Sequence, residues 1–236
     1  MKPITILFVI TLIIFSCSQS KKQETNAYIP EEKFVDSLNI GQKGKTKVEI
    51  EKFHRNNNDE TFVIVNFYKQ DSVWNFKKQK NVGNVWRLTD KFYFDKDGIT
   101  GIDAALEDFN NDGFNDFTYK SGIAARGGNE IRTLFIYDQK NRRFIHIKNS
   151  DNYPNLSFNS TLNCINSLIL TGSTTTAFLR IRKDSLEEFA RVDVSDKILV
   201  EEKDSLGEFK VIGEGIFEGT DEDSYKIFKN YKPLQY

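Results

Sequence analysis

The sequence predicts an all-β fold made of a meander of antiparallel hairpins, and three observations support this. Phenylalanine and tyrosine number 20 and 9, and aromatic residues favour strands. Short apolar or alternating segments, separated by clusters of turn residues, recur from about residue 45 onward. Residues 183–189 (KDSLEEF) return as 203–209 (KDSLGEF). That period matches one hairpin, so each copy is expected to be a turn that opens a strand.

The individual elements follow from local patterns. Residues 47–53 alternate between polar and apolar side chains, 56–59 make a turn, and 62–68 return as a second strand. Three further strand pairs are predicted by the same signals: 85–94 with 99–106, 134–137 with 144–147, and 165–170 with 177–181. A helix is expected only near 31–38, where Pro30 can occupy the first turn.

The N-terminus has the pattern of a secretory signal. Lys2 precedes an apolar run over residues 4–15, which is about 18 Å long as a helix and too short for a bilayer core of about 30 Å. Ile14-Phe15-Ser16-Cys17 resembles the lipid-attachment box of bacterial lipoproteins. The resemblance implies a signal peptide at 1–16, lipid on the Cys17 thiol, and an envelope protein held on a membrane. An uncleaved anchor and an ordinary signal peptide are the alternatives.

These signals divide the chain into three parts. Residues 1–16 are the signal peptide, 17–44 the lipidated N-terminus with a polar tether, and 45–236 the β-domain. The two cysteines take separate roles, since Cys17 is the anchor and Cys164, beside Ile165, is expected in the core.

One loop has the residues of a calcium site. Residues 108–116 read D-x-N-x-D-G-x-x-D, and Ca²⁺ takes six to eight oxygen ligands. Gly113 permits the sharp turn that such a loop requires. The expected ligands are the side chains of Asp108, Asn110, Asp112 and Asp116 and the carbonyl of Phe114. Tyr119 stands where an EF-hand has glutamate, so the loop is not an EF-hand. An Asx-rich turn without an ion is the alternative.

This loop resembles the calcium loop of FG-GAP and VCBS-type β-propeller repeats. Residues 127–129 (GGN) and Tyr137-Asp138 extend the similarity to small propeller-like proteins of the bacterial envelope. The resemblance implies a β-propeller-like or two-sheet fold and a calcium ion. It also implies a role as an inhibitor of peptidoglycan hydrolases or as an immunity protein, which some members have. Only one full copy of the loop is present, with a fragment at 95–98, so a compact fold is expected rather than a large ring.

Charge and motifs narrow the function. The net charge is −1, which argues against nucleic acid as a partner. His54 and His146 lie in unrelated contexts, with His146 expected to face solvent, and no nucleophile elbow, P-loop or dinucleotide motif occurs. The glycine-rich loop at 122–129 offers Arg126 and Asn129 as candidate binding residues.

The sequence therefore predicts a non-catalytic, lipid-anchored envelope binding protein stabilised by calcium, and the family resemblance adds the implied role of an inhibitor or immunity protein against a cell-wall hydrolase. A carboxylate-dependent glycan or peptidoglycan hydrolase and a structural component of a surface complex are the alternatives.

Overall fold

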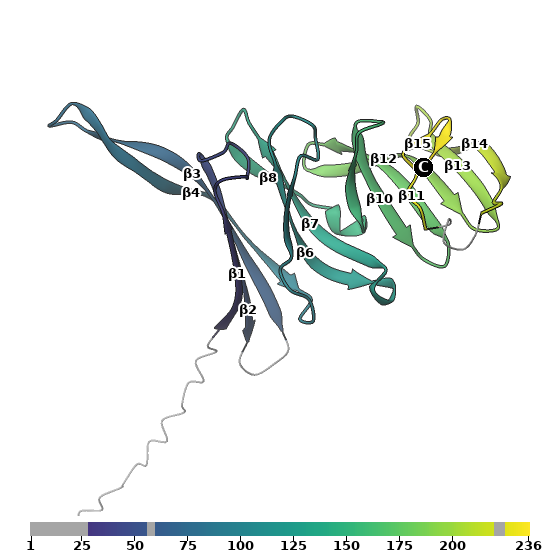
Figure 1. Cartoon of the computed structure of the whole chain (residues 1–236), viewed down its shortest axis with the longest axis horizontal. Coiled ribbons are helices and arrows are strands. Elements are labelled where there is room, and N and C mark those ends of the chain that lie inside the picture. The colour runs from purple at the N-terminus through teal and green to yellow at the C-terminus, as the bar shows by residue number, and fades with distance from the viewer. Residues whose placement is uncertain (1–27, 56–59, 220–224) are drawn as a thin grey trace, which may run out of the picture.

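The computed structural model describes residues 28–55, 60–219 and 225–236, and in these residues the regular elements are antiparallel strands and two short 3-10 turns (Figure 1). The predicted all-β fold of antiparallel hairpins is confirmed. No helix in the described part of the chain is long and apolar enough to span a bilayer. The signal peptide and Cys17 lie outside the described residues.

The strands form three main sheets, each a meander of consecutive strands. The first sheet contains β1 (Tyr28–Asp36), β2 (Thr46–Arg55), β3 (Thr61–Asn75) and β4 (Lys80–Lys96). The middle sheet contains β5 (Ala104–Glu107), β6 (Asp116–Ala124), β7 (Asn129–Asp138) and β8 (Arg143–Ile147). The last sheet contains β9 (Leu156–Asn159), β10 (Cys164–Leu170), β11 (Thr174–Arg182), β12 (Ser185–Val194), β13 (Lys197–Lys203) and β14 (Phe209–Ile216). The hairpin of β15 (Asn230–Tyr231) and β16 (Leu234–Gln235) follows.

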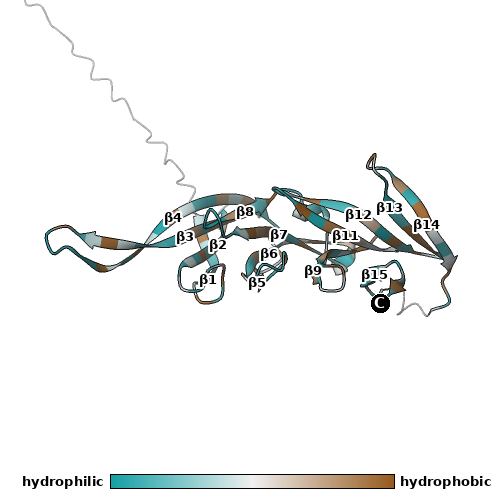
Figure 2. Ribbon diagram, turned by 90° about the horizontal axis from the view of Figure 1, so that it is seen from above, coloured by the Kyte–Doolittle hydropathy of each residue, from teal (hydrophilic) through white to brown (hydrophobic). Residues whose placement is uncertain are grey.

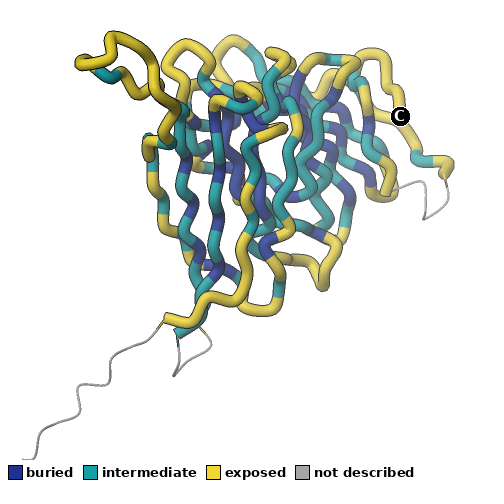
Figure 3. The backbone as a smooth tube through the Cα atoms, turned by 60° about the vertical axis from the view of Figure 1, so that its left-hand side comes forward, coloured by how far each residue is buried: buried dark blue, intermediate teal, exposed yellow. Residues whose placement is uncertain are grey.

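The core lies in layers between these sheets, visible as the buried interior of Figure 3. In β3, Val63, Val65 and Phe67 are fully buried while the residues between them are partly exposed, as expected for a sheet with one covered face. They pack against the middle sheet through Phe117, Tyr119, Phe135, Tyr137 and Phe144. The opposite face of the middle sheet packs on the last sheet through Leu134, Ile136 and Ile147. The middle sheet is therefore buried on both faces.

The C-terminal segment covers the far side of the last sheet. Phe228 is 2% exposed and belongs to a core cluster with Phe178 and Val192, and the Tyr231 ring lies 5.2 Å from that of Phe178. Cys164 is buried in the same cluster, as the sequence predicted, and burial raises the pKa of its thiol to about 11. This thiol is a core side chain.

Several predicted pairings are confirmed, namely β2 with β3, β7 with β8, and β10 with β11. The two KDSL segments form the β11–β12 and β13–β14 turns, so each copy does open a strand. The predicted pairing of 85–94 with 99–106 is wrong, because β4 stays in the first sheet while β5 pairs with β6 in the middle sheet. The segment between β4 and β5 is a crossing between sheets.

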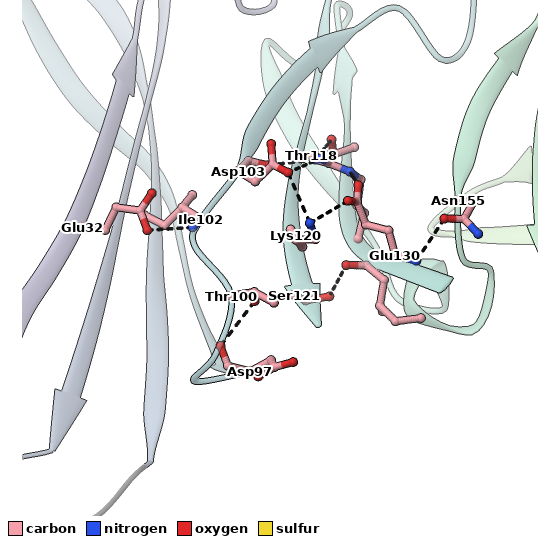
Figure 4. Close-up of polar contacts among 12 residues, drawn as sticks. Glu32, Asp97, Thr100, Ile102, Asp103, Thr118, Lys120, Ser121, Glu130 and Asn155 are labelled. Atoms are coloured by element: carbon pink, nitrogen blue, oxygen red, sulfur yellow. Dashed lines mark hydrogen bonds and ion pairs between the residues drawn. The ribbon is translucent and has the colours of Figure 1, made fainter. Parts of the chain in front are cut away.

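The predicted tether and helix also need correction. Tyr28–Asp36 is strand β1, paired along its length with β2. Phe34 packs against the first core layer, and the Glu32 carboxylate accepts a hydrogen bond of 2.8 Å from the Ile102 backbone N–H (Figure 4). Sheet pairing and this contact with the crossing segment override the local helix signal at Pro30.

Two buried lysines hold the crossing segment against the first sheet. The Lys52 ammonium donates to the Thr100 carbonyl at 3.0 Å and pairs with Glu31 at 3.1 Å. The Lys96 ammonium donates to the Asp97 carbonyl and to the Thr100 hydroxyl. Burial, together with the neighbouring charge of Lys52, lowers the pKa of Lys96 to about 8.

This arrangement predicts a pH-dependent stability. Between about pH 8 and 10.5 the unfolded chain binds a proton at Lys96 that the folded chain has released, so the contribution of Lys96 to the free energy of unfolding should rise with pH. Urea titrations give the free energy of unfolding of the parent minus that of Lys96→Met. This difference should be about 2 kcal/mol more positive at the upper end of that pH range than at the lower end. The exposed Lys91 on the same strand provides the control, since Lys91→Met should leave the pH profile of the parent unchanged. A constant difference between parent and Lys96→Met would contradict the prediction.

Candidate functional site

The connections between strands gather at two ends of the stacked sheets (Figure 1). The entry end, where β1 begins at Tyr28, carries the β6–β7 turn at Ala125–Gly127 and the β10–β11 turn at 171–173. The far end carries the β1–β2 connection, the loop at 108–115 and the β7–β8 turn. The predicted calcium loop and the predicted binding loop therefore lie at opposite ends.

The loop at 108–115 joins β5 to β6 and is organised by its own side chains. The Asp108 carboxylate accepts hydrogen bonds from the backbone N–H groups of Asp112 at 3.1 Å and Gly113 at 2.8 Å. The Asn110 carbonyl oxygen accepts from the Asp112 N–H at 3.1 Å, and the Asp112 carboxylate accepts from the Phe114 N–H at 2.9 Å. Gly113 has φ +86°, the left-handed conformation that favours glycine.

Asp116 differs from the other acids of the loop because it is fully buried. Its carboxylate accepts hydrogen bonds from the backbone N–H groups of Tyr137 at 2.8 Å and Phe109 at 2.9 Å. Its pKa is raised to about 8, chiefly by burial; the two hydrogen bonds oppose the rise, and the Asp112 and Asp108 carboxylates contribute to it. Asp116 therefore joins the loop to β7 in the middle sheet.

The donor set matches a hard divalent cation in its chemistry. Three carboxylates lie close enough to repel one another, and in the described residues no lysine or arginine forms an ion pair with them. Each carboxylate oxygen that accepts one hydrogen bond retains a second lone pair. Within the described ranges, no group of three or more His, Cys, Asp or Glu side chains lies where it could hold a metal ion, so the predicted ligands are not gathered into a metal site in this structure.

At the entry end, the β6–β7 turn borders a cavity of about 720 Å³. Ala125 and Arg126 have φ of +48° and +56°, which is uncommon for residues with a Cβ and is a form of strain found at functional sites. Arg126 is exposed. The rest of the cavity wall includes Ser173, Thr174, Asp196, Phe217 and Tyr225.

This cavity is assembled from segments that the sequence analysis did not connect. Ser173 lies in the β10–β11 turn, Asp196 in the β12–β13 turn, and Tyr225 near the C-terminus. The only local signal was turn composition at Gly172 and at Asp196. A guanidinium, hydroxyl groups, a carboxylate and two aromatic rings surround one space, which is suited to binding a polar ligand or a side chain of a partner.

Asn129 does not face this cavity as a binding residue. Its side chain is 5% exposed, and its amide donates to the Leu170 carbonyl at 3.1 Å and accepts from the Leu170 N–H at 3.0 Å. It therefore joins β7 to β10 and positions the loop that carries Arg126.

His146 also differs from its prediction, because it is half-buried against aromatic rings instead of fully facing solvent. Its ring lies 4.9 Å from Phe94 and 5.2 Å from Phe135, and burial lowers its pKa. It packs in the first core layer, away from the cavity at the entry end.

Comparison with known proteins shows no family to which the chain belongs. No protein-family model matches it, and no curated protein matches it. A solved structure from Xanthomonas, described as a type IV secretion system related protein, is similar with a TM-score of 0.43 and 13% sequence identity. The similarity covers 81% of this chain and 96% of that one.

Proposed function

We propose that this chain is a non-catalytic binding protein of the bacterial cell envelope, anchored by lipid at Cys17, that binds and inhibits a cell-wall hydrolase through the cavity at its entry end. The observation that carries the proposal is Arg126, an exposed cation in a left-handed turn, mounted on the middle sheet beside a cavity of about 720 Å³. Rigid scaffolds with loops of this kind typically serve recognition.

The chemistry of Arg126 suits such a partner. Most glycan hydrolases use a pair of carboxylates in an open cleft, and guanidinium groups bind carboxylates through two parallel hydrogen bonds. The two hydrogen bonds between the Asn129 side chain and the Leu170 backbone limit movement of the loop. Less conformational entropy is therefore lost when the loop binds a partner.

The test is capture and inhibition with the full chain. Bacterial envelope extract passed over the immobilised protein should yield a lytic enzyme, and adding the protein should suppress release of peptidoglycan fragments by that enzyme. Arg126→Ala should weaken inhibition at least tenfold, as expected for loss of a charge-assisted contact. Arg142→Ala is the matched control, since Arg142 is also exposed and left-handed (φ +52°) but lies in the β7–β8 turn at the far end.

Two results would reject the function. The first is release of peptidoglycan fragments by the chain alone, which would identify an enzyme. The second is an Arg126→Ala variant that inhibits as well as the parent. The lipid anchor is tested separately. If the Cys17 thiol carries lipid, the Cys17→Ser variant should be found in the soluble fraction instead of the membrane fraction.

We further propose that the loop at 108–116 binds calcium as a structural ion, with ligands from Asp108, Asn110, Asp112, the Phe114 carbonyl and Asp116. The ion would neutralise carboxylates that otherwise repel one another. With a dissociation constant of about 0.1 to 1 mM, as in extracellular modules, about 1 mM calcium should stabilise the fold by roughly 0.4 to 1.4 kcal/mol.

The calcium prediction concerns the melting temperature. Adding about 1 mM calcium should raise Tm by about 1 to 5 °C, and Asp112→Ala should abolish the rise. Asp138→Ala is the control, because Asp138 organises the β7–β8 turn through Asn141 and its loss should keep the response to calcium. Scanning calorimetry with and without EDTA makes the measurement, and an unresponsive parent would rule out the site.

A further inference from the structure

The hairpin of β3 and β4 extends beyond the rest of the molecule (Figure 1). The last pair between β2 and β3 joins Thr46 to Lys69, and from Gln70 to Asn75 the strand β3 pairs with β4. We call the part at 70–86 the projecting hairpin. Two-stranded ribbons are marginally stable alone, so packing within the fold does not explain why this hairpin projects so far.

The composition of this hairpin is unlike that of the whole chain. No aspartate or glutamate occurs from Ser72 to Thr89, although the complete sequence has 34 of them. Its tip carries three lysines within four positions, Lys77, Lys78 and Lys80. All three are exposed, and none forms an ion pair with a described residue. The tip is therefore a local excess of positive charge on a nearly neutral protein.

Large apolar side chains are exposed beside these lysines. Phe76 is 86% exposed and Trp74 52%, with Val73 and Val82 at 40% and 48%. Figure 2 shows hydrophobic segments along the projecting hairpin, and Figure 3 shows most of it as exposed. Trp74 and Val73 are neighbours on one strand and point to opposite faces, so the ribbon is apolar on both faces.

The base of the hairpin is held while its tip is free. The Lys47 ammonium lies 4.2 Å from the Tyr68 ring and 5.4 Å from the Trp86 ring, and Arg87 pairs with Asp71 at 2.8 Å. These contacts fix where the ribbon leaves the first sheet. Trp74 and Phe76 lie beyond them, at the end of the ribbon opposite to this support.

We propose that the tip of the projecting hairpin inserts Trp74 and Phe76 into the interface of an anionic lipid bilayer, with Lys77, Lys78 and Lys80 against the lipid phosphates. Indole rings favour the boundary between headgroups and acyl chains. Lysine stems cover apolar surface while their ammonium groups stay at the headgroups, and each basic residue adds attraction to an anionic leaflet.

The shape of the tip favours a bilayer over a folded protein partner. A bilayer surrounds an inserted ribbon and covers apolar side chains on both faces, whereas a flat protein surface covers one face. The absence of acids removes repulsion from anionic headgroups. The proposal does not depend on the cavity at the entry end, so either can fail alone.

The two tryptophans supply the test, because the whole sequence has only Trp74 and Trp86, both on this hairpin. In the full chain, Trp86→Phe leaves the tip residue as the fluorescent reporter, and Trp74→Phe leaves the base residue. The probe is a vesicle of phosphatidylcholine mixed with phosphatidylglycerol. The fluorescence emission of the tip reporter should shift to shorter wavelength on vesicles and be quenched by lipids brominated on their acyl chains. The emission of the base reporter should change much less. This readout is independent of how the N-terminal segment behaves.

Charge variants test the role of the lysines. The triple variant Lys77→Gln, Lys78→Gln and Lys80→Gln, made with Trp86→Phe, should bind anionic vesicles with about 100-fold lower affinity, read from the lipid concentration at half of the spectral change. The matched control replaces three exposed lysines of the last sheet with glutamine, Lys183, Lys197 and Lys210, and should keep the full response.

Three results would overturn the proposal. One is a tip reporter that does not respond to anionic vesicles. A second is an equal response to vesicles of phosphatidylcholine alone, which would remove the role of charge. The third is a response to soluble polyglutamate without a response to vesicles, which would assign the tip to an acidic protein instead.

Discussion

Phe67→Ala should cost about 3 to 5 kcal/mol of unfolding free energy, the largest loss expected from a single side chain in this protein. Phe67 is fully buried, and its ring stacks on the ring of Phe144 with the two centroids 4.3 Å apart. It also makes edge-to-face contacts with Phe135 and Phe117, with ring centroids 5.0 Å and 5.9 Å apart. Truncation removes one ring from an aromatic cluster that joins the first and middle sheets, so a cavity opens where two sheets depend on each other.

Urea denaturation provides the measurement. Tyr93→Ala is the matched control, because Tyr93 is an aromatic residue of the adjacent strand β4 but is 62% exposed, and its loss should cost less than about 1 kcal/mol. Phe67→Leu should fall between the two. A Phe67→Ala variant within about 1 kcal/mol of the parent would show that the first sheet does not depend on this contact.

Asp116→Ala should destabilise the protein by about 2 to 5 kcal/mol even when calcium is absent. The substitution leaves the backbone N–H groups of Phe109 and Tyr137 without their acceptor, and each buried unsatisfied donor costs roughly 1 to 3 kcal/mol. Asp116→Asn should cost less, because the amide keeps one acceptor oxygen.

The measurement is made in EDTA, which separates this hydrogen-bonding role from any role in binding an ion. Asp108→Ala is the control, since its carboxylate bonds exposed loop N–H groups instead of buried ones. Equal losses for Asp116→Ala and Asp108→Ala would contradict the distinction between the buried acid and the exposed acids of the loop.

The fold class was accessible from sequence because strand alternation is a local property. The period-two pattern of β2 and β3 places Val48, Ile50 and Val65 on one face whatever the rest of the chain does. Turn composition located the two KDSL turns and the loop at 108–116 for the same reason, since these residues act through bonds to their own neighbours.

The candidate sites were accessible only in part. The predicted loops exist at the predicted positions, but the roles of individual side chains depend on distant residues. Asn129 was a candidate binding residue from its place in a glycine-rich loop, and the Leu170 backbone makes it a structural bridge. The cavity beside Arg126 includes Asp196 and Tyr225, which are about 70 and 100 positions away in sequence.

By itself, the sequence determined the all-β class, three of the four strand pairings that it predicted and the oxygen-rich loop, because each follows from side chains close together along the chain. Tertiary structure alone decided that Tyr28–Asp36 joins the first sheet and that the chain crosses between sheets after Lys96. It also decided that Asp116 is buried and that His146 is half-buried beside Phe94. The physical reason is that a strand pattern defines two faces but does not specify what covers them. Packing between sheets supplies that choice, and it also leaves the projecting hairpin uncovered.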